Sequence, residues 1–243
     1  MTLTDALFAV IAALAALTQT VAGFGFMLVA STLGALVMPM PEVVPLALPL
    51  SLVSTTWVAV DQRRLVDRRL ILRTILPAMA LGSGLGFLLN GALPEALMRG
   101  LLGVIVLGFV VLRLTRRART PRPWTVWQRT PVIVAAGIVQ GLFGTGGPLL
   151  VMAVEGMGLA HGQFRATLMA VWTLINTALV TAIVVGGRYD AALLWRFVIA
   201  LPAVAAGVFA GQHLHKRLSP ERFQIAVYMM LALAAAGLLW PKG

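Results

Sequence analysis

Residues 140–148 read QGLFGTGGP, a cluster of glycines followed by a proline inside a run that is otherwise apolar. Residues 19–25 read QTVAGFG and repeat its frame, Q-x-x-x-G-x-G, 121 positions earlier. The matching positions are Gln19, Gly23 and Gly25 in the first stretch and Gln140, Gly144 and Gly146 in the second. Because glycine and proline both disfavour a continuous helix, the recurrence predicts two helix breaks at corresponding places in the chain.

The composition is that of a membrane protein. Of the 243 residues, 60% are hydrophobic and 11% are charged, and the mean hydropathy is +0.94. Soluble domains average about 45–50% apolar and about 25% charged residues. Five further apolar stretches approach the roughly 20 residues of a spanning helix. They are 70–89, 97–114, 164–186, 193–214 and 223–240. The sequence therefore predicts an all-α polytopic membrane protein.

The positive charge fits a role in membrane orientation. The 19 Lys and Arg residues give a formal net charge of +11, and the chain has no cysteine, which excludes disulfide and thiol chemistry. Basic residues of membrane proteins collect on the cytoplasmic side, so we do not interpret them as a nucleic-acid surface. One pair of expected spans separates the Arg-rich segments 61–73 and 113–130, so both are predicted to be cytoplasmic. The N-terminus lacks a basic region and a cleavage site, so its first apolar stretch is expected to be retained.

The chain contains a second internal repeat. Residues 76–95 read LPAMALGSGLGFLLNGALPE, and residues 201–221 read LPAVAAGVFAGQHLHKRLSPE. This match and the Q-x-x-x-G-x-G match are offset by about half the chain. We therefore predict a first repeat over 1–114, a basic linker over 115–130 and a second repeat over 131–243. Internal duplication of this kind is typical of secondary transporters.

Small residues recur at four-residue spacing within the second match. Gly82 and Gly86 align with Gly207 and Gly211. This spacing places both glycines on one helix face, where two backbones can approach closely in lipid. These four glycines are predicted to be helix-packing positions and not substrate contacts.

The lengths of the broken segments restrict how they can cross a membrane. Residues 5–38 would form a straight helix of about 51 Å, against a hydrocarbon core of about 30 Å. The second copy offers residues 132–142 and 149–159, and each half would span only about 16 Å. If each broken segment crosses the membrane once, the two repeats are parallel. If each broken segment is a hairpin, the two repeats are inverted. The short second copy favours a hairpin plus three spanning helices in each repeat, and thus inverted repeats.

A helix broken at membrane depth suits anion binding. Such a break exposes backbone N–H groups at the positive end of the helix dipole, glycines let a ligand approach closely, and irregular backbone is tolerated only in protein or beside a cavity. The hydroxyl of Thr145 and the amides of the two glutamines add donors. The candidate substrate-binding residues are Gln19, Gly23, Gly25, Thr55, Gln140, Gly144, Thr145, Gly146, Gly147, Trp172 and Asn176. The alternative interpretation is a plain kink with tight helix packing.

Other polar residues within apolar runs complete the candidate set. Thr55 and Asn176 are separated by 121 positions, like the two glutamines, and Trp172 lies one turn before Asn176. Glu155 is a carboxylate within an apolar run and is a candidate for proton coupling, although it could instead meet water at the interface. Arg165 could attract an anion electrostatically, or extend its side chain to the membrane interface.

Together these motifs resemble a known family. The duplicated G-x-G breaks, GLFGTGGPLLV over 141–151 and FRATLMAVWTLIN over 164–176 are similar to the TauE/SafE family of sulfite and organosulfonate transporters. The resemblance covers nearly the whole chain. It implies a permease for small sulfur-containing or carboxylate anions in a bacterial inner membrane. The first copy, AGFGFMLVAS, lacks the richer glycine run and the proline, so its break is expected to be milder.

The leading hypothesis is a proton-coupled secondary anion transporter that works by alternating access. The alternatives are an anion channel and a membrane assembly subunit without transport activity. An enzyme is not expected, because the sequence has no H-E-x-x-H motif, no cysteine and no intramembrane carboxylate pair. We predict no cofactor, no metal site and no nucleic-acid partner. The expected partners are the anion, protons and lipid, and homodimerisation is left open.

Overall fold

The computed structural model describes residues 2–22, 24–115, 124–215 and 220–240, and all regular structure in them is helical. The main helices are α1 (Leu3–Ala22), α2 (Phe26–Val37), α3 (Met40–Asp61), α5 (Leu76–Asn90), α6 (Glu95–Thr115), α7 (Val126–Phe143), α8 (Gly147–Val154), α9 (His161–Val185), α10 (Ala191–His215) and α11 (Pro220–Leu239). Short turns are η1 (Arg63–Leu65), α4 (Arg68–Leu70), η2 (Ile71–Ile75) and η3 (Glu155–Met157). The predicted all-α class is confirmed.

The outer surface suits lipid. By length and composition, six helices of the described residues could cross a membrane. Large apolar side chains such as Leu88, Val185 and Leu233 are exposed on the outside, while polar side chains such as Gln140 and Asn176 are buried. This distribution is the reverse of that in a water-soluble protein. The chain is therefore a multi-pass membrane protein.

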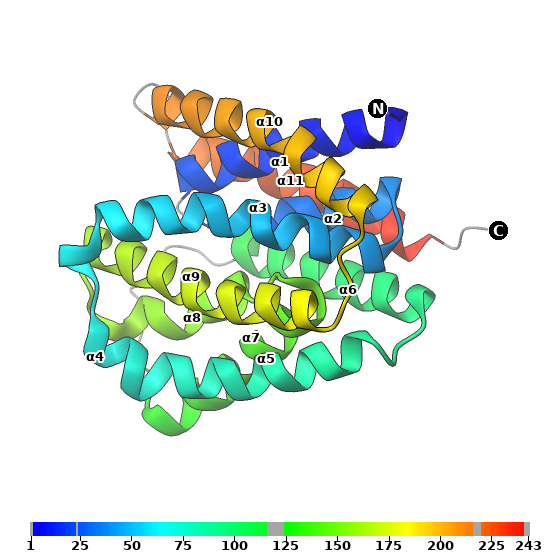
Figure 1. The fold of residues 1–243 in the computed structure, drawn as a ribbon. Coiled ribbons are helices and arrows are strands. Elements are labelled where there is room, and N and C mark those ends of the chain that lie inside the picture. The colour runs from blue at the N-terminus through cyan, green and yellow to red at the C-terminus, as the bar shows by residue number, and fades with distance from the viewer. Residues whose placement is uncertain (1, 23, 116–123, 216–219, 241–243) are drawn as a thin grey trace.

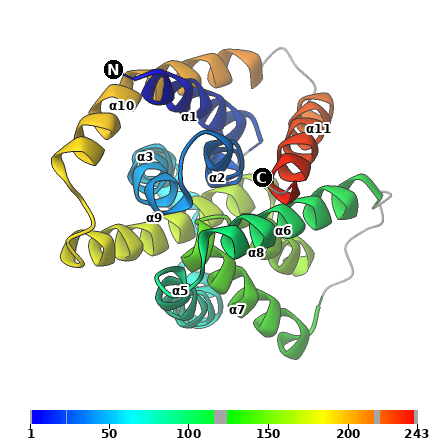
Figure 2. The same cartoon turned by 90° about the vertical axis from the view of Figure 1, so that its right-hand side faces the viewer.

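The two halves of the chain are packed into each other. α5 lies along α7, and α10 lies along α1, so in each pair one helix comes from each half (Figure 1). Figure 2 shows α1 and α10 at one edge of the molecule and α5 and α7 at the opposite edge, with α3 and α9 between them. α3 also packs against α9, and α6 against α11. Every one of these contacts joins the first half to the second.

Glycines form the closest of these contacts, as predicted. A Cβ atom on Gly82 or Gly86 of α5 would overlap a backbone carbonyl oxygen of α7. A Cβ on Gly207 of α10 would likewise overlap the carbonyl oxygen of Ala13 in α1. Gly137 and Gly141 of α7, which were not predicted, face α5 in the same way. The role of these glycines as packing positions is confirmed.

The first broken segment folds back on itself. A Cβ on Gly34, near the end of α2, would lie 3.3 Å from Cε2 of Phe8, near the start of α1. The second segment differs from the expected two halves of 11 residues. α7 has 18 residues and α8 has 8. α7 begins early because Thr125 and Gln128 form a capping box ahead of Pro131, so α7 alone is about 27 Å long.

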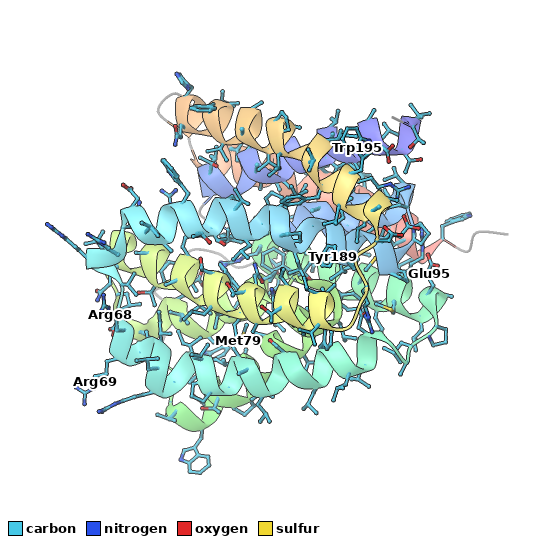
Figure 3. All side chains as sticks on the ribbon, in the orientation of Figure 1. Arg68, Arg69, Met79, Glu95, Tyr189 and Trp195 are labelled. Atoms are coloured by element: carbon cyan, nitrogen blue, oxygen red, sulfur yellow. The ribbon has the colours of Figure 1, made fainter. Side chains whose placement is uncertain are left out.

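Prolines interrupt the hydrogen bonds of α3 just before its polar residues. The carbonyl of Pro45 would normally accept a bond from residue 49, but Pro49 has no N–H group. The hydroxyl of Tyr189 donates to this carbonyl at 2.7 Å and replaces the missing bond (Tyr189 is labelled in Figure 3). Burial raises the pKa of Tyr189 to about 12, so its hydroxyl keeps its proton.

Gly82 and Gly84 provide a matched test of the packing. Gly84 is two residues from Gly82 on α5, and a Cβ there would meet open space. We expect Gly82→Ala to lower stability by about 1–3 kcal/mol, because α5 must move away from α7. Gly84→Ala should be neutral or raise stability by up to about 1 kcal/mol, because alanine favours helix. Thermal unfolding in detergent measures both, and equal effects would contradict the packing role.

Candidate functional site

The second break is held closed by the side chain of Gln140. α7 ends at Phe143 and is followed by its C-cap Gly144, whose φ of 70° lies in the left-handed region and whose N–H donates to the Gln140 backbone carbonyl at 2.7 Å. Two residues later, the N–H of Gly146 donates to Oε1 of Gln140 at 2.9 Å. Pro148 then occupies the first turn of α8, where no intrahelical N–H is needed. The break is a defined structure and not a loose loop.

The first break is as complete as the second, so the expectation of a milder break is wrong. α1 ends at Ala22 and α2 begins at Phe26. Gly25 is the N-cap of α2 with a φ of 108°, and Gly146, which lies 121 positions later, is the N-cap of α8. Gly25 supplies a left-handed conformation at this break, so no following proline is required to end α1 and begin α2. Gly23 lies outside the described residues.

The two breaks contact each other. The hydroxyl of Ser31 on α2 donates to the carbonyl of Phe143, at the end of α7, at 2.7 Å. The side chain of Asn90 on α5 donates to the neighbouring Leu142 carbonyl at 2.7 Å. These bonds satisfy carbonyls that a helix end leaves free, which lipid could not do. Met27 packs over Gly144, where any Cβ would overlap its methyl group.

One cavity lies between the two breaks. It is lined by Gln19, Phe24, Gly25, Phe26, Met27, Leu28, Ser51, Thr55, Gln140, Gly144, Thr145, Gly147, Pro148, Trp172 and Asn176. Most of the predicted substrate-binding residues are therefore brought together from α1, α3, α7, α9 and the breaks. Gly146 is not in the lining, because it faces α7, where a Cβ would overlap the carbonyl oxygen of Ala136. The role of these residues in binding stays a prediction.

A chain of hydrogen bonds crosses the cavity wall. Nε2 of Gln140 donates to Oδ1 of Asn176 at 2.7 Å, and Nδ2 of Asn176 donates to Oγ of Ser51 at 3.4 Å. These bonds connect α7, α9 and α3. Gln140, expected to be a free donor, is thus largely occupied within the protein. The unpaired polar atoms lie elsewhere in the cavity, at Oε1 of Gln19 and Oγ1 of Thr145.

Arg165 lies beside this cavity, and its side chain is not part of the lining. Arg165 is half-buried on α9 and donates to the backbone carbonyl of Thr20 at 3.5 Å, while its buried Nε atom has no partner. Met169, Trp172 and Asn176 follow at spacings of 4, 7 and 11 residues, which place them on the same helix face. The guanidinium therefore contacts the backbone of the residue that follows Gln19, and Arg165 lies on the same face of α9 as the cavity residues Trp172 and Asn176.

Glu155 is paired with an arginine. Its carboxylate lies 2.7 Å from the Arg113 guanidinium, which also stacks over the ring of Phe109. Arg196 of α10 similarly binds Asp5 of α1 and Glu42 of α3. Each cluster joins one half of the chain to the other. A coupling role for Glu155 stays a prediction, but the residue does not line the cavity.

Several residues of the site were not singled out from the sequence. Ser31 and Asn90 close the end of α7, Met169 accepts a weak bond from Nε2 of Gln19 at 3.7 Å, and Phe24 and Phe26 form apolar wall. The only sequence signal for Ser31 and Asn90 is that they are polar residues beside apolar runs. Their partners lie 112 and 52 positions away, beyond the reach of local patterns.

Comparison with known proteins places this architecture in a family. The family model described as sulfite exporter TauE/SafE matches residues 8–238, a range that includes both breaks and all the cavity residues. The chain belongs to the TauE/SafE family. The resemblance of the GLFGTGGPLLV and FRAT stretches is thereby confirmed, and TauE/SafE proteins are membrane transporters. No solved structure matches the chain.

A curated relative supports the assignment as a membrane transporter. The chain is 28% identical over 168 residues to the probable inner membrane transporter protein TsaS of Comamonas testosteroni. The match covers 68% of this chain and 68% of TsaS. The family model and this relative both support a membrane transporter.

Neighbouring glycines at the second break should respond differently to alanine. Gly146→Ala should lower stability by about 1–3 kcal/mol, because its Cβ would overlap the backbone of α7. Gly147→Ala should leave stability within about 0.5 kcal/mol, because its Cβ would meet only Cζ2 of Trp172 at 3.7 Å. Unfolding temperatures of the purified variants measure the difference. A larger loss of stability for Gly147→Ala than for Gly146→Ala would contradict the positions of these two glycines in the second break.

Proposed function

We propose that this protein is a secondary transporter that moves a small anion across the membrane by alternating access, coupled to protons. One observation carries the proposal: two helix breaks, one from each half of the chain, line a single cavity whose wall retains unpaired polar atoms. Buried polar atoms require a partner, and lipid offers none. Broken helices at the interface of two related halves are where secondary transporters bind their substrates.

The cavity chemistry and the relatives support an anion as substrate. Amide and hydroxyl groups line the cavity, the described lining contains no carboxylate, and Arg165 lies nearby. The family description names sulfite export, and the name of TsaS specifies an inner membrane transporter. We therefore infer that the substrate is sulfite, an organosulfonate or a related carboxylate, and that the membrane is a bacterial inner membrane.

Inverted repeats would provide the two alternating states. We infer one repeat over 1–114 and a second over 131–243. In each repeat, the folded-back segment returns to the side from which it started, and each of three longer helical runs crosses the membrane once. The number of net crossings per repeat is therefore odd, which inverts the second repeat relative to the first. The exchanged pairs, α5 with α7 and α10 with α1, support this arrangement. Arg188 also bonds Asn90 at 3.4 Å, and Asn90 lies at the end of α5 opposite the basic segment at Arg68 and Arg69.

Cysteine labelling tests this topology, because the chain has no native cysteine. With segments 61–73 and 113–130 in the cytoplasm, an Arg188→Cys variant should react with a membrane-impermeant maleimide added to intact cells. A cysteine at Arg64 or Arg68 should be protected until the cells are opened. Protection of position 188 in intact cells would favour parallel repeats.

Ligand-dependent stability and counterflow test the function. Sulfite, methanesulfonate or a small carboxylate should raise the unfolding temperature, with about 2.7 kcal/mol of stabilisation at a hundredfold excess over Kd. Proteoliposomes should exchange labelled for unlabelled anion, which a channel would not do against a gradient. Gly147→Leu should abolish both signals by filling the cavity beside Trp172, whereas Gly100→Leu, in open space on α6, should abolish neither. A response to amines or metal cations alone would reverse the assignment.

A further inference from the structure

The cavity is polar but carries no charge of its own. Its polar lining consists of amides and hydroxyls, contributed by Gln19, Ser51, Thr55, Gln140, Thr145 and Asn176. None of the described lining residues is Asp, Glu, His, Lys or Arg. Moving an ion from water into such a site costs free energy, and this cost rises with the square of the ionic charge. A singly charged ligand is therefore strongly favoured over a doubly charged one.

The unpaired atoms add a second requirement. Gln19 is 4% exposed and Thr145 is 2% exposed, and neither Oε1 of Gln19 nor Oγ1 of Thr145 has a partner. An amide oxygen can only accept hydrogen bonds, so its partner must be an O–H or N–H group. A fully ionised oxyanion offers acceptors alone. By contrast, a group with one ionised and one protonated oxygen can donate to Oε1 of Gln19 and accept from its Nε2.

The charged and titratable groups on the helices around Gln19 lie outside the described cavity lining. On α10, which packs along α1, His213 is exposed and its Nδ1 lies 2.8 Å from the carbonyl oxygen of Phe209. On α9, Arg165 contacts the carbonyl of the adjacent Thr20, and arginine stays charged at all physiological pH values. On α11, Tyr228 lines a neighbouring small pocket with Thr18, Phe24 and Gly25, and a phenol ionises only in strong alkali. Asp5 lies on α1, 14 residues before Gln19 and about 21 Å along the helix, where it pairs with Arg196.

We propose that the cavity binds an oxyanion with two ionisable protons, such as sulfite, as its protonated monoanion, so that the coupled proton travels on the substrate and not on a carboxylate of the protein. This inference rests on the proposed function and names the substrate form that the site takes. For sulfite, the bound species is hydrogensulfite. It enters with its O–H bond intact and releases that proton to water on the far side. Each cycle then moves one sulfite, one proton and a net single negative charge.

The test compares two anions of similar size on the purified wild-type protein. Sulfite exchanges between a protonated monoanion and a dianion near neutral pH, whereas methanesulfonate remains an unprotonated monoanion. Binding is measured by calorimetry from about pH 6 to about pH 9. The affinity for sulfite should fall about tenfold per pH unit above the second pKa of sulfite. The affinity for methanesulfonate should not change with pH.

Variants test whether the transported proton is carried by the substrate or by a side chain of the protein. Gln19→Met keeps the side-chain length but removes the amide, so it should weaken hydrogensulfite binding about ten- to a hundredfold and methanesulfonate binding less. Gln128→Met is the matched control, because Gln128 caps the start of α7 away from the cavity. Glu155, the candidate coupling carboxylate, and His161, four residues before Arg165, are the protein groups tested as alternative proton carriers. Glu155→Gln and His161→Gln should keep the pH slope for sulfite. All affinities are calculated from the concentration of folded protein in each sample.

The outcomes are distinguishable. A sulfite affinity that does not depend on pH, an equal slope for methanesulfonate, or a slope lost in Glu155→Gln or His161→Gln would overturn this inference while leaving an anion transporter in place. A failure of both anions to bind at any pH, with no counterflow, would overturn the proposed function and this inference with it.

Discussion

The side-chain amide of Gln140 is the interaction on which the rest of the site depends. Within a membrane, a broken helix must find partners inside the protein for the N–H and C=O groups that it releases. The Gln140 oxygen accepts the Gly146 N–H, and its nitrogen donates to Asn176. One side chain thus closes the break and fixes the position of α9 across the cavity. Ser31 and Asn90 complete the closure at the neighbouring carbonyls.

Equivalent glutamines consequently have different surroundings. Gln140 is engaged at both ends of its amide, whereas Gln19 makes one weak contact with Met169 and keeps an unpaired oxygen. Of the unpaired polar atoms at the cavity, the first half of the chain therefore supplies the amide oxygen of Gln19, and the second half supplies the hydroxyl of Thr145. The two glutamines occupy corresponding positions before the two breaks, and the partners available to each decide which of its amide atoms stays unpaired.

Much of the structure could be predicted from the sequence, because it leaves a local or periodic pattern there. This holds for the membrane class, the paired breaks, the glycine packing faces and most of the cavity residues. The 121-residue recurrence was sufficient to bring Thr55 and Asn176 into the same set as the two glutamines. Errors arose where long-range packing decides. Gly146 faces the backbone of α7 and not the cavity. The length of α7 depends instead on a local signal: the Thr125–Gln128 capping box begins the helix ahead of Pro131, so α7 is longer than the proline alone indicates.

The exchange of helices between the halves also affects the order in which the chain can assemble. α1 packs on α10, and the carbonyl of Ala13 faces Gly207, almost 200 residues further along the chain. At about 5–20 residues per second, synthesis separates these partners by roughly 10–40 s. Throughout that interval, α1 lies in the bilayer without α10, the helix against which its residue Ala13 packs. Final folding must therefore wait for the second half, and a truncated chain would hold an unfilled groove for cellular quality control to recognise.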